Sequence, residues 1–125
     1  MAITLGSVAI IPAGTSIDPG GTEAAPVAAG APAAVGPFAD IMDGIAYRVT
    51  NGAAAPGVGL TFVGYGIDSG GRMYEIGRFT HVTTAGESTS GMLVPLVPFS
   101  SYTVCVFGNT SNAVTVEAYV QRQIP

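Results

Sequence analysis

The chain has 125 residues, of which 48% are hydrophobic and only 10% are charged, and it contains no lysine. Ordinary globular domains carry about 25% charged residues. A net charge of −4, with four scattered arginines as the basic residues, argues against nucleic acid as a partner. No run reaches the roughly 18 apolar residues that cross a bilayer, and the N-terminal segment lacks the basic region of a secretion signal.

The low charge has a consequence for the surface of the protein. A domain of this length exposes roughly 6,000 Å², so its charged side chains are spread at about one per 500 Å². A surface with so few charges does little to prevent association with other proteins. The composition therefore predicts a protein that works inside an assembly, as a homotrimer or a homodimer.

Hydrophobic residues alternate with a period of two and give almost no helical signal, which predicts one all-β domain over residues 1–125. Seven strands are expected, over residues 3–11, 45–50, 58–67, 72–83, 91–97, 101–108 and 113–122. Glycine and proline punctuate them, with a hairpin turn at 68–71. This pattern favours an antiparallel β-sandwich or jelly roll. The expected core consists of inward-facing strand residues: Ile45, Tyr47, Val49, Leu60, Phe62, Val104, Val106, Val114, Val116 and Val120.

Residues 12–37 interrupt this pattern between the first two strands. The segment is mostly alanine, glycine and proline, which is typical of a flexible linker. Loops of this length are uncommon inside compact domains. Because ordering a residue costs about 1–2 kcal/mol, an ordered segment must gain contacts elsewhere. We therefore expect a long extended Ala/Pro/Gly arm that packs either along its own domain or along a neighbouring subunit.

Cys105 and His81, the only cysteine and histidine, are the first candidates for chemistry. Cys105 lies in an apolar run, which predicts a buried and inert thiol. A Cys105–His81 dyad stays open as the alternative, although a catalytic base also needs an orienting acid. Ser88 and Ser90 belong to a polar segment that is expected to be a loop, and it lacks the closing glycine of a nucleophile elbow.

Other polar residues also favour structural roles. Asp40 and Asp43 supply too few oxygen ligands for calcium, so a capped turn ending at Gly44 is expected around residues 38–44. The sequon that starts at Asn109 is expected to mark a hairpin tip rather than a glycan. An aromatic sugar platform is disfavoured because there is no tryptophan. The sequence therefore predicts no catalytic, cofactor-binding or metal site, and no enzyme activity.

The chain is predicted to be a small all-β domain with few charges, an Ala/Pro/Gly arm and no group of catalytic residues. In this it resembles accessory proteins of tailed-phage virions, in particular head decoration or cement proteins. The resemblance implies a structural protein of the virion, assembled in the host cytoplasm. It would bind a major capsid protein and stabilise the head lattice through oligomer and arm contacts. It implies no small-molecule substrate. The alternatives are a fibre or adhesin head that binds a host glycan, and a structural component of the tail.

Overall fold

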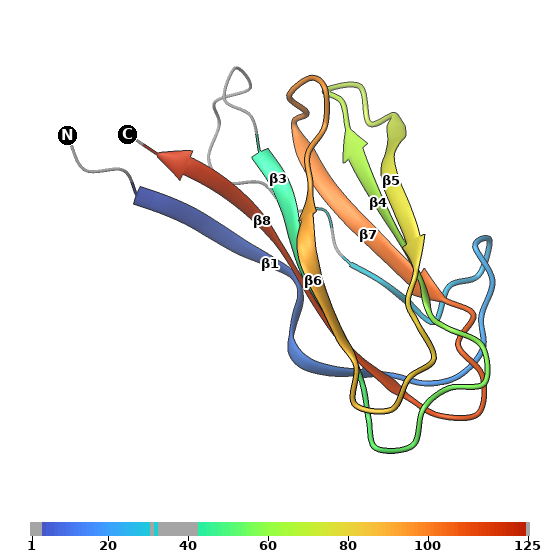
Figure 1. The fold of residues 1–125 in the computed structure, drawn as a ribbon. Helices are drawn as coiled ribbons and strands as arrows, with labels where there is room; N and C mark the ends of the chain where they lie inside the picture. The colour runs from blue at the N-terminus through green and yellow to red at the C-terminus, as the bar shows by residue number, and fades with distance from the viewer. Residues whose placement is uncertain (1–3, 31, 33–42, 125) are drawn as a thin grey trace.

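The computed structural model describes residues 4–30, 32 and 43–124 and shows two antiparallel sheets packed as a sandwich (Figure 1). Sheet 1 has the strand order β1-β8-β3-β6, and sheet 2 has the order β2-β7-β4-β5. The strands are β1 Thr4–Ile17, β2 Ala28–Ala29, β3 Asp43–Asn51, β4 Thr61–Ile67, β5 Met73–Thr80, β6 Ser88–Leu93, β7 Ser101–Phe107 and β8 Val114–Ile124. The described residues contain no helix, and hence none that could span a membrane. The predicted β-sandwich is confirmed, and the strand that was not predicted, β2, has only two residues.

The first strand is longer and less regular than its sequence pattern indicates. β1 continues to Ile17, and its pairing with β8 shifts register between Ala9 and Ile11 and again between Ile11 and Thr15. Register shifts of this kind bend a strand and change the faces of its side chains. Ile10 and Ile11 are therefore both buried, although neighbouring residues of a regular strand face opposite sides.

The predicted strand over residues 91–97 is wrong at both ends. β6 begins at Ser88, so the polar segment expected as a loop is an edge strand that pairs with β3. Residues 94–97 leave the sheet and form the connection to β7. Pro95 and Pro98 lack the backbone N–H that would continue the pairing. The expected turn over 38–44 falls mostly outside the described residues, and Asp43 and Gly44 begin β3.

The core lies between the sheets. All ten predicted core residues are buried except Tyr47, which is half-buried. The ring of Tyr47, on sheet 1, packs against Phe62 and Phe79, on sheet 2, with centroids between 4.7 and 5.2 Å apart. This aromatic cluster joins the two sheets.

β7 is buried on both of its faces, which is unusual for a sheet that has only one partner sheet. Residues 102–106 are all buried, although only every second one faces the core. Val63 on β4 is also fully buried, although its neighbour Phe62 is the one that faces sheet 1. Something other than sheet 1 must therefore cover the outer face of sheet 2.

The arm lies at the edge of sheet 2, beside β7, and its Glu23 reaches over that face. Gly20 exchanges two backbone hydrogen bonds with residues 108–109, at N···O distances of 2.8 and 2.7 Å. Val27 and Gly30 donate their N–H groups to β7 carbonyls at 3.2 and 2.9 Å, on either side of β2. The sequence left open whether the arm packs along its own domain or along a neighbouring subunit. Residues 12–30 pack along their own domain. Residues 31 and 33–37 of the predicted arm lie outside the described residues.

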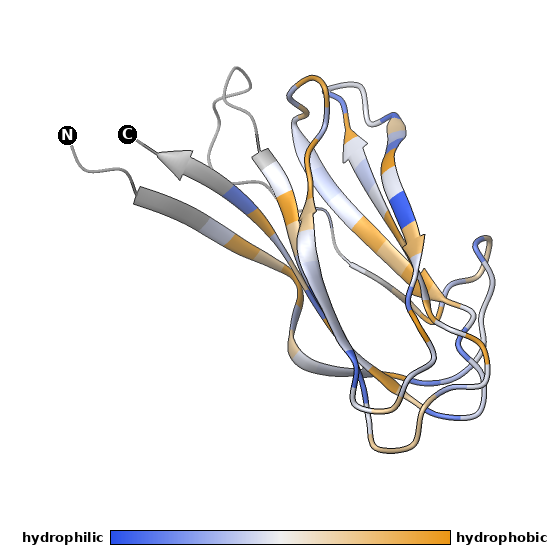
Figure 2. Cartoon of the chain, in the orientation of Figure 1, coloured by the Kyte–Doolittle hydropathy of each residue, from blue (hydrophilic) through white to orange (hydrophobic). Residues whose placement is uncertain are grey.

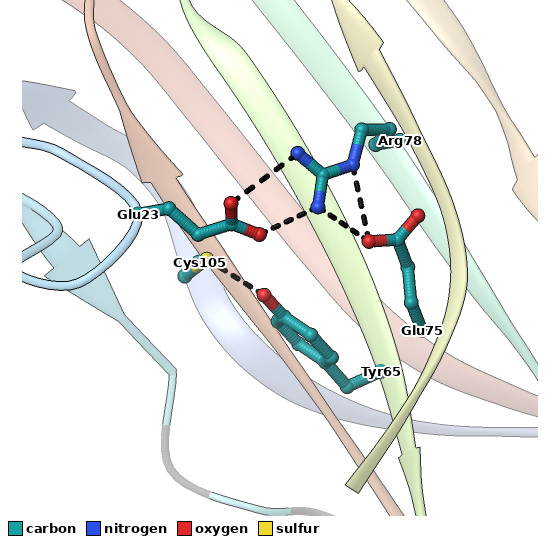
Figure 3. A network of polar contacts seen from close by, with 5 residues as sticks. All are labelled: Glu23, Tyr65, Glu75, Arg78 and Cys105. Carbon is teal, nitrogen blue, oxygen red and sulfur yellow. Dashed lines mark hydrogen bonds and ion pairs between the residues drawn. The ribbon is translucent and has the colours of Figure 1, made fainter.

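A polar cluster holds the arm across the sheet (Figure 3). Arg78 on β5 donates to Glu23 of the arm at 2.5 Å and also to Glu75. Because β2 and β5 lie at opposite edges of sheet 2, the side chains of Glu23 and Arg78 meet across its outer face. Beside this ion pair, the hydroxyl of Tyr65 lies 3.6 Å from the sulfur of Cys105. Burial is the main cause that raises the pKa of both groups.

The cover can be tested at Gly30. A Cβ at this position would collide with the side chain of Ile10 and would lie 3.0 Å from its carbonyl oxygen. Gly30→Ala should therefore loosen the arm from β7, and a thiol reagent should react with Cys105 at least about tenfold faster than in the wild type. Gly52→Ala is the matched control, because no atom lies within 4 Å of the position that its new methyl group would take. A Gly30→Ala protein whose Cys105 reacts at the wild-type rate would contradict the covering role.

Candidate functional site

One end of the sandwich is apolar and open to solvent. The connection between β6 and β7 crosses from sheet 1 to sheet 2 there, and Figure 2 shows its hydrophobic colouring at the top of the view. Leu96 is 100% exposed, and Val94 and Val97 are 59% and 56% exposed. Met73 and Tyr74, at the start of β5, are 54% and 45% exposed. We call these five residues the apolar end.

Phe99 anchors this connection to the sandwich. Its ring lies edge-on to buried Tyr102 at a centroid distance of 6.0 Å and 5.8 Å from Tyr74. The Phe99 N–H donates to the hydroxyl of Tyr102 at 3.1 Å. A side chain at Gly66 would collide with the Phe99 ring, so the glycine makes room for the anchor. The apolar residues before Phe99 are thus presented outward from a fixed base.

A shallow pocket of about 220 Å³ lies between this connection and β5. Its lining is mostly apolar, with Ile76 and Phe99 joining residues 94–97, and Glu75 is the charged member. The pocket gives the apolar end a concave part into which an apolar side chain of another molecule could fit.

The β4–β5 turn beside the apolar end is the hairpin turn that the sequence predicted. Asp68 accepts hydrogen bonds from the N–H groups of Gly70 and Arg72, both at 2.9 Å, and from the Arg72 Nε at 3.1 Å. These bonds, led by the backbone N–H of Arg72, hold the pKa of Asp68 below its ordinary value. Gly71 takes a φ of 83°, a conformation that glycine adopts readily.

The structure gives Cys105 and His81 different partners. Cys105 is buried, as predicted, and its polar contact is Tyr65. His81 follows β5, and its Nε2 lies 3.2 Å from the carbonyl oxygen of Glu87. The buried Asn51 donates to two further carbonyls of the same loop, at 2.8 and 2.9 Å. His81 and Asn51 therefore position the 81–87 loop, and the described residues do not form a Cys–His dyad.

The other candidates are not brought together either. Ser88 and Ser90 project from strand β6, which lacks the sharp strand-to-helix turn of a nucleophile elbow. Asp40 lies outside the described residues, and so does the side chain of Asp43. In the described part of the chain, no three His, Cys, Asp or Glu side chains gather as a metal site would require.

The sequon asparagine points into the protein. Asn109 is fully buried where the chain turns from β7 to β8. Its Nδ2 donates to the carbonyl oxygens of Ile17 and Asn112, at 3.3 and 3.0 Å. The nitrogen that a glycan would modify is therefore engaged. The expected hairpin tip is wrong, because β7 belongs to sheet 2 and β8 to sheet 1, so this turn connects the two sheets. Sequence reasoning also missed that Asn109 ties the end of β1 to this turn.

Asn109→Ala should lower the free energy of unfolding by about 1–3 kcal/mol, because it leaves buried carbonyl groups without a donor. Urea denaturation followed by circular dichroism measures this loss. Ser69→Ala, at an exposed turn position, is the control and should change stability by less than about 0.5 kcal/mol. An Asn109→Ala variant as stable as this control would contradict the tying role.

No protein-family model and no curated protein matches the sequence. The fold, in contrast, is similar to solved structures. A chain of an infectious bursal disease virus particle matches 98% of this chain with a TM-score of 0.56 and 8% identity. A chain of the Gx strain of the same virus matches 98% with a TM-score of 0.51 and 11% identity. A Bacillus endospore appendage, from a family of disulfide-linked pili, covers 98% at 15% identity with a TM-score of only 0.44.

The similarity to the viral chains is one of fold, and it covers only a part of each viral chain. This chain spans about a third of their length, 31% and 32% respectively. The sandwich is thus an architecture that chains of viral particles also contain.

Proposed function

We propose that this chain is a structural protein of a viral particle and associates with other subunits through its apolar end. The observation that carries the proposal is the apolar end itself, five large apolar side chains that are 45–100% exposed at one end of a chain with 10% charged residues. Contiguous exposed apolar patches mark protein–protein contact sites. The fold likeness to viral-particle chains favours a virion over other assemblies, by analogy of fold.

Within that role we propose a capsid decoration or cement protein, present in the virion and assembled in the host cytoplasm. Such a protein would form a homotrimer or homodimer and bind a major capsid protein. Symmetry repeats each weak contact around the shell, so a modest surface on every subunit sums to a strong attachment. Because residues 18–30 are used within their own domain, the lattice contact is assigned to the apolar end rather than to the arm.

The proposed role is not enzymatic. Its support is that the two first candidates have structural partners: Cys105 contacts Tyr65, and His81 holds the 81–87 loop. The raised pKa of the Cys105 thiol, caused mainly by burial, also disfavours the thiolate that a nucleophile requires.

Leu96→Glu tests the assembly proposal. Wild-type protein should sediment as a dimer or trimer at high micromolar concentration. The variant should sediment as a monomer, with association at least about 100-fold weaker, because an unpaired carboxylate would be buried in the contact. Leu96 is fully exposed in the subunit, so the substitution should leave the fold unchanged.

Val82→Glu is the matched control. Val82 is half-exposed and follows the end of β5, whereas the apolar end includes the start of that strand. This variant should keep the wild-type oligomeric state. A wild type that stays monomeric, or a Leu96→Glu variant that associates like the Val82→Glu control, would overturn the proposed role of the apolar end.

A further inference from the structure

The outer face of sheet 1 carries a hollow that the apolar end does not include. Small residues of β3 and β6, with Ala46 among them, leave a space of about 390 Å³. Its larger lining residues are Tyr47, whose ring packs toward sheet 2, and Arg48, Glu117, Tyr119 and Gln121. The hollow is open to solvent, so a ligand there would lie against the sheet rather than be enclosed.

The strand register explains why these residues meet. Ala46 lies opposite Tyr119, and Arg48 lies opposite Glu117 on β8 and opposite Ser90 on β6. Side chains two residues apart on a strand share a face, so all five face away from sheet 2. Small residues on β3 and β6, beside the row of long side chains on β8, produce the hollow.

Several polar groups in the hollow lack a partner. Although Arg48 and Glu117 are cross-strand neighbours, Glu117 accepts instead from the hydroxyl of Tyr119 at 3.2 Å. The side chains of Arg48, Ser90 and Gln121 make no hydrogen bond to another described residue. Glu117, Tyr119 and Gln121 are nevertheless half-buried. The hollow thus offers unpaired donors from all three strands and a carboxylate acceptor on β8.

We propose that this hollow binds a neutral sugar. An anionic ligand would be attracted by Arg48 but repelled by the adjacent Glu117. A cationic ligand would be attracted by Glu117 but repelled by Arg48. Sugar hydroxyls both donate and accept, so they can bond to a guanidinium, a carboxylate and an amide at once. The ring of Tyr119 and the methyl group of Ala46 supply apolar surface for the C–H face of a pyranose.

The first test is a titration of the ¹⁵N-labelled full chain with the methyl glycosides of glucose, galactose, mannose and N-acetylglucosamine. At least one should shift the amide signals of Ala46, Arg48, Ser90 and residues 117–121, with a dissociation constant on the order of 1 mM. Sialyllactose and methylammonium serve as the charged probes and should bind more weakly. Stronger binding of a charged probe, or no shift at the hollow with any glycoside, would overturn the proposal.

The second test fills the hollow. Ala46→Leu should weaken glycoside binding by at least about tenfold, because its side chain would occupy the space of the ring. Thr115→Leu is the matched control, since it lies exposed on the same face of β8 but outside the hollow, and it should bind as the wild type does. Equal binding by the Ala46→Leu and Thr115→Leu variants would contradict the site. The oligomeric state is measured separately, so failure of the assembly proposal leaves these outcomes unaffected.

Discussion

The outer face of sheet 2 has to be covered, and much of the structure depends on how this is done. β7 carries apolar residues toward both faces, and sheet 1 can bury only one of them. Each Å² of apolar surface removed from water contributes about 25 cal/mol, so leaving Val63 and Cys105 open would be costly. The arm contributes Glu23, whose ion pair with Arg78 of β5 crosses this face, and its backbone hydrogen bonds hold it at the β7 edge. Exposed ion pairs contribute little energy, so Arg78 orients the arm more than it stabilises it.

This use of the arm changes the account of assembly. A segment whose N–H groups already bond to its own β7 is not free to order on a neighbour. The apolar surface left without a cover lies instead at the connection between the sheets, anchored by Phe99. A rigid base under exposed apolar side chains lowers the entropy lost on association. The sugar-binding hollow lies on the face of sheet 1 and leaves the apolar end available.

The sequence predicts much of the fold because burial leaves a clear pattern in most strands. Alternation in β8 placed Val114, Val116 and Val120 in the core, where the structure has them. β6 was missed in part because its serine, threonine and glycine residues carry little strand signal. The arm could not be placed from its side chains, since backbone groups hold most of it. The hollow depends on the register of three strands, so no single segment indicates it.

Hydrogen exchange on the isolated subunit tests the covering role of the arm most directly. The amides of Gly20, Val27 and Gly30 donate to carbonyls of the domain, so they open only when the arm leaves sheet 2. These three amides should therefore exchange slowly in the free subunit, at rates comparable to those of neighbouring β7 amides. Rapid exchange of all three in the free subunit, with protection that arises only on assembly, would contradict it.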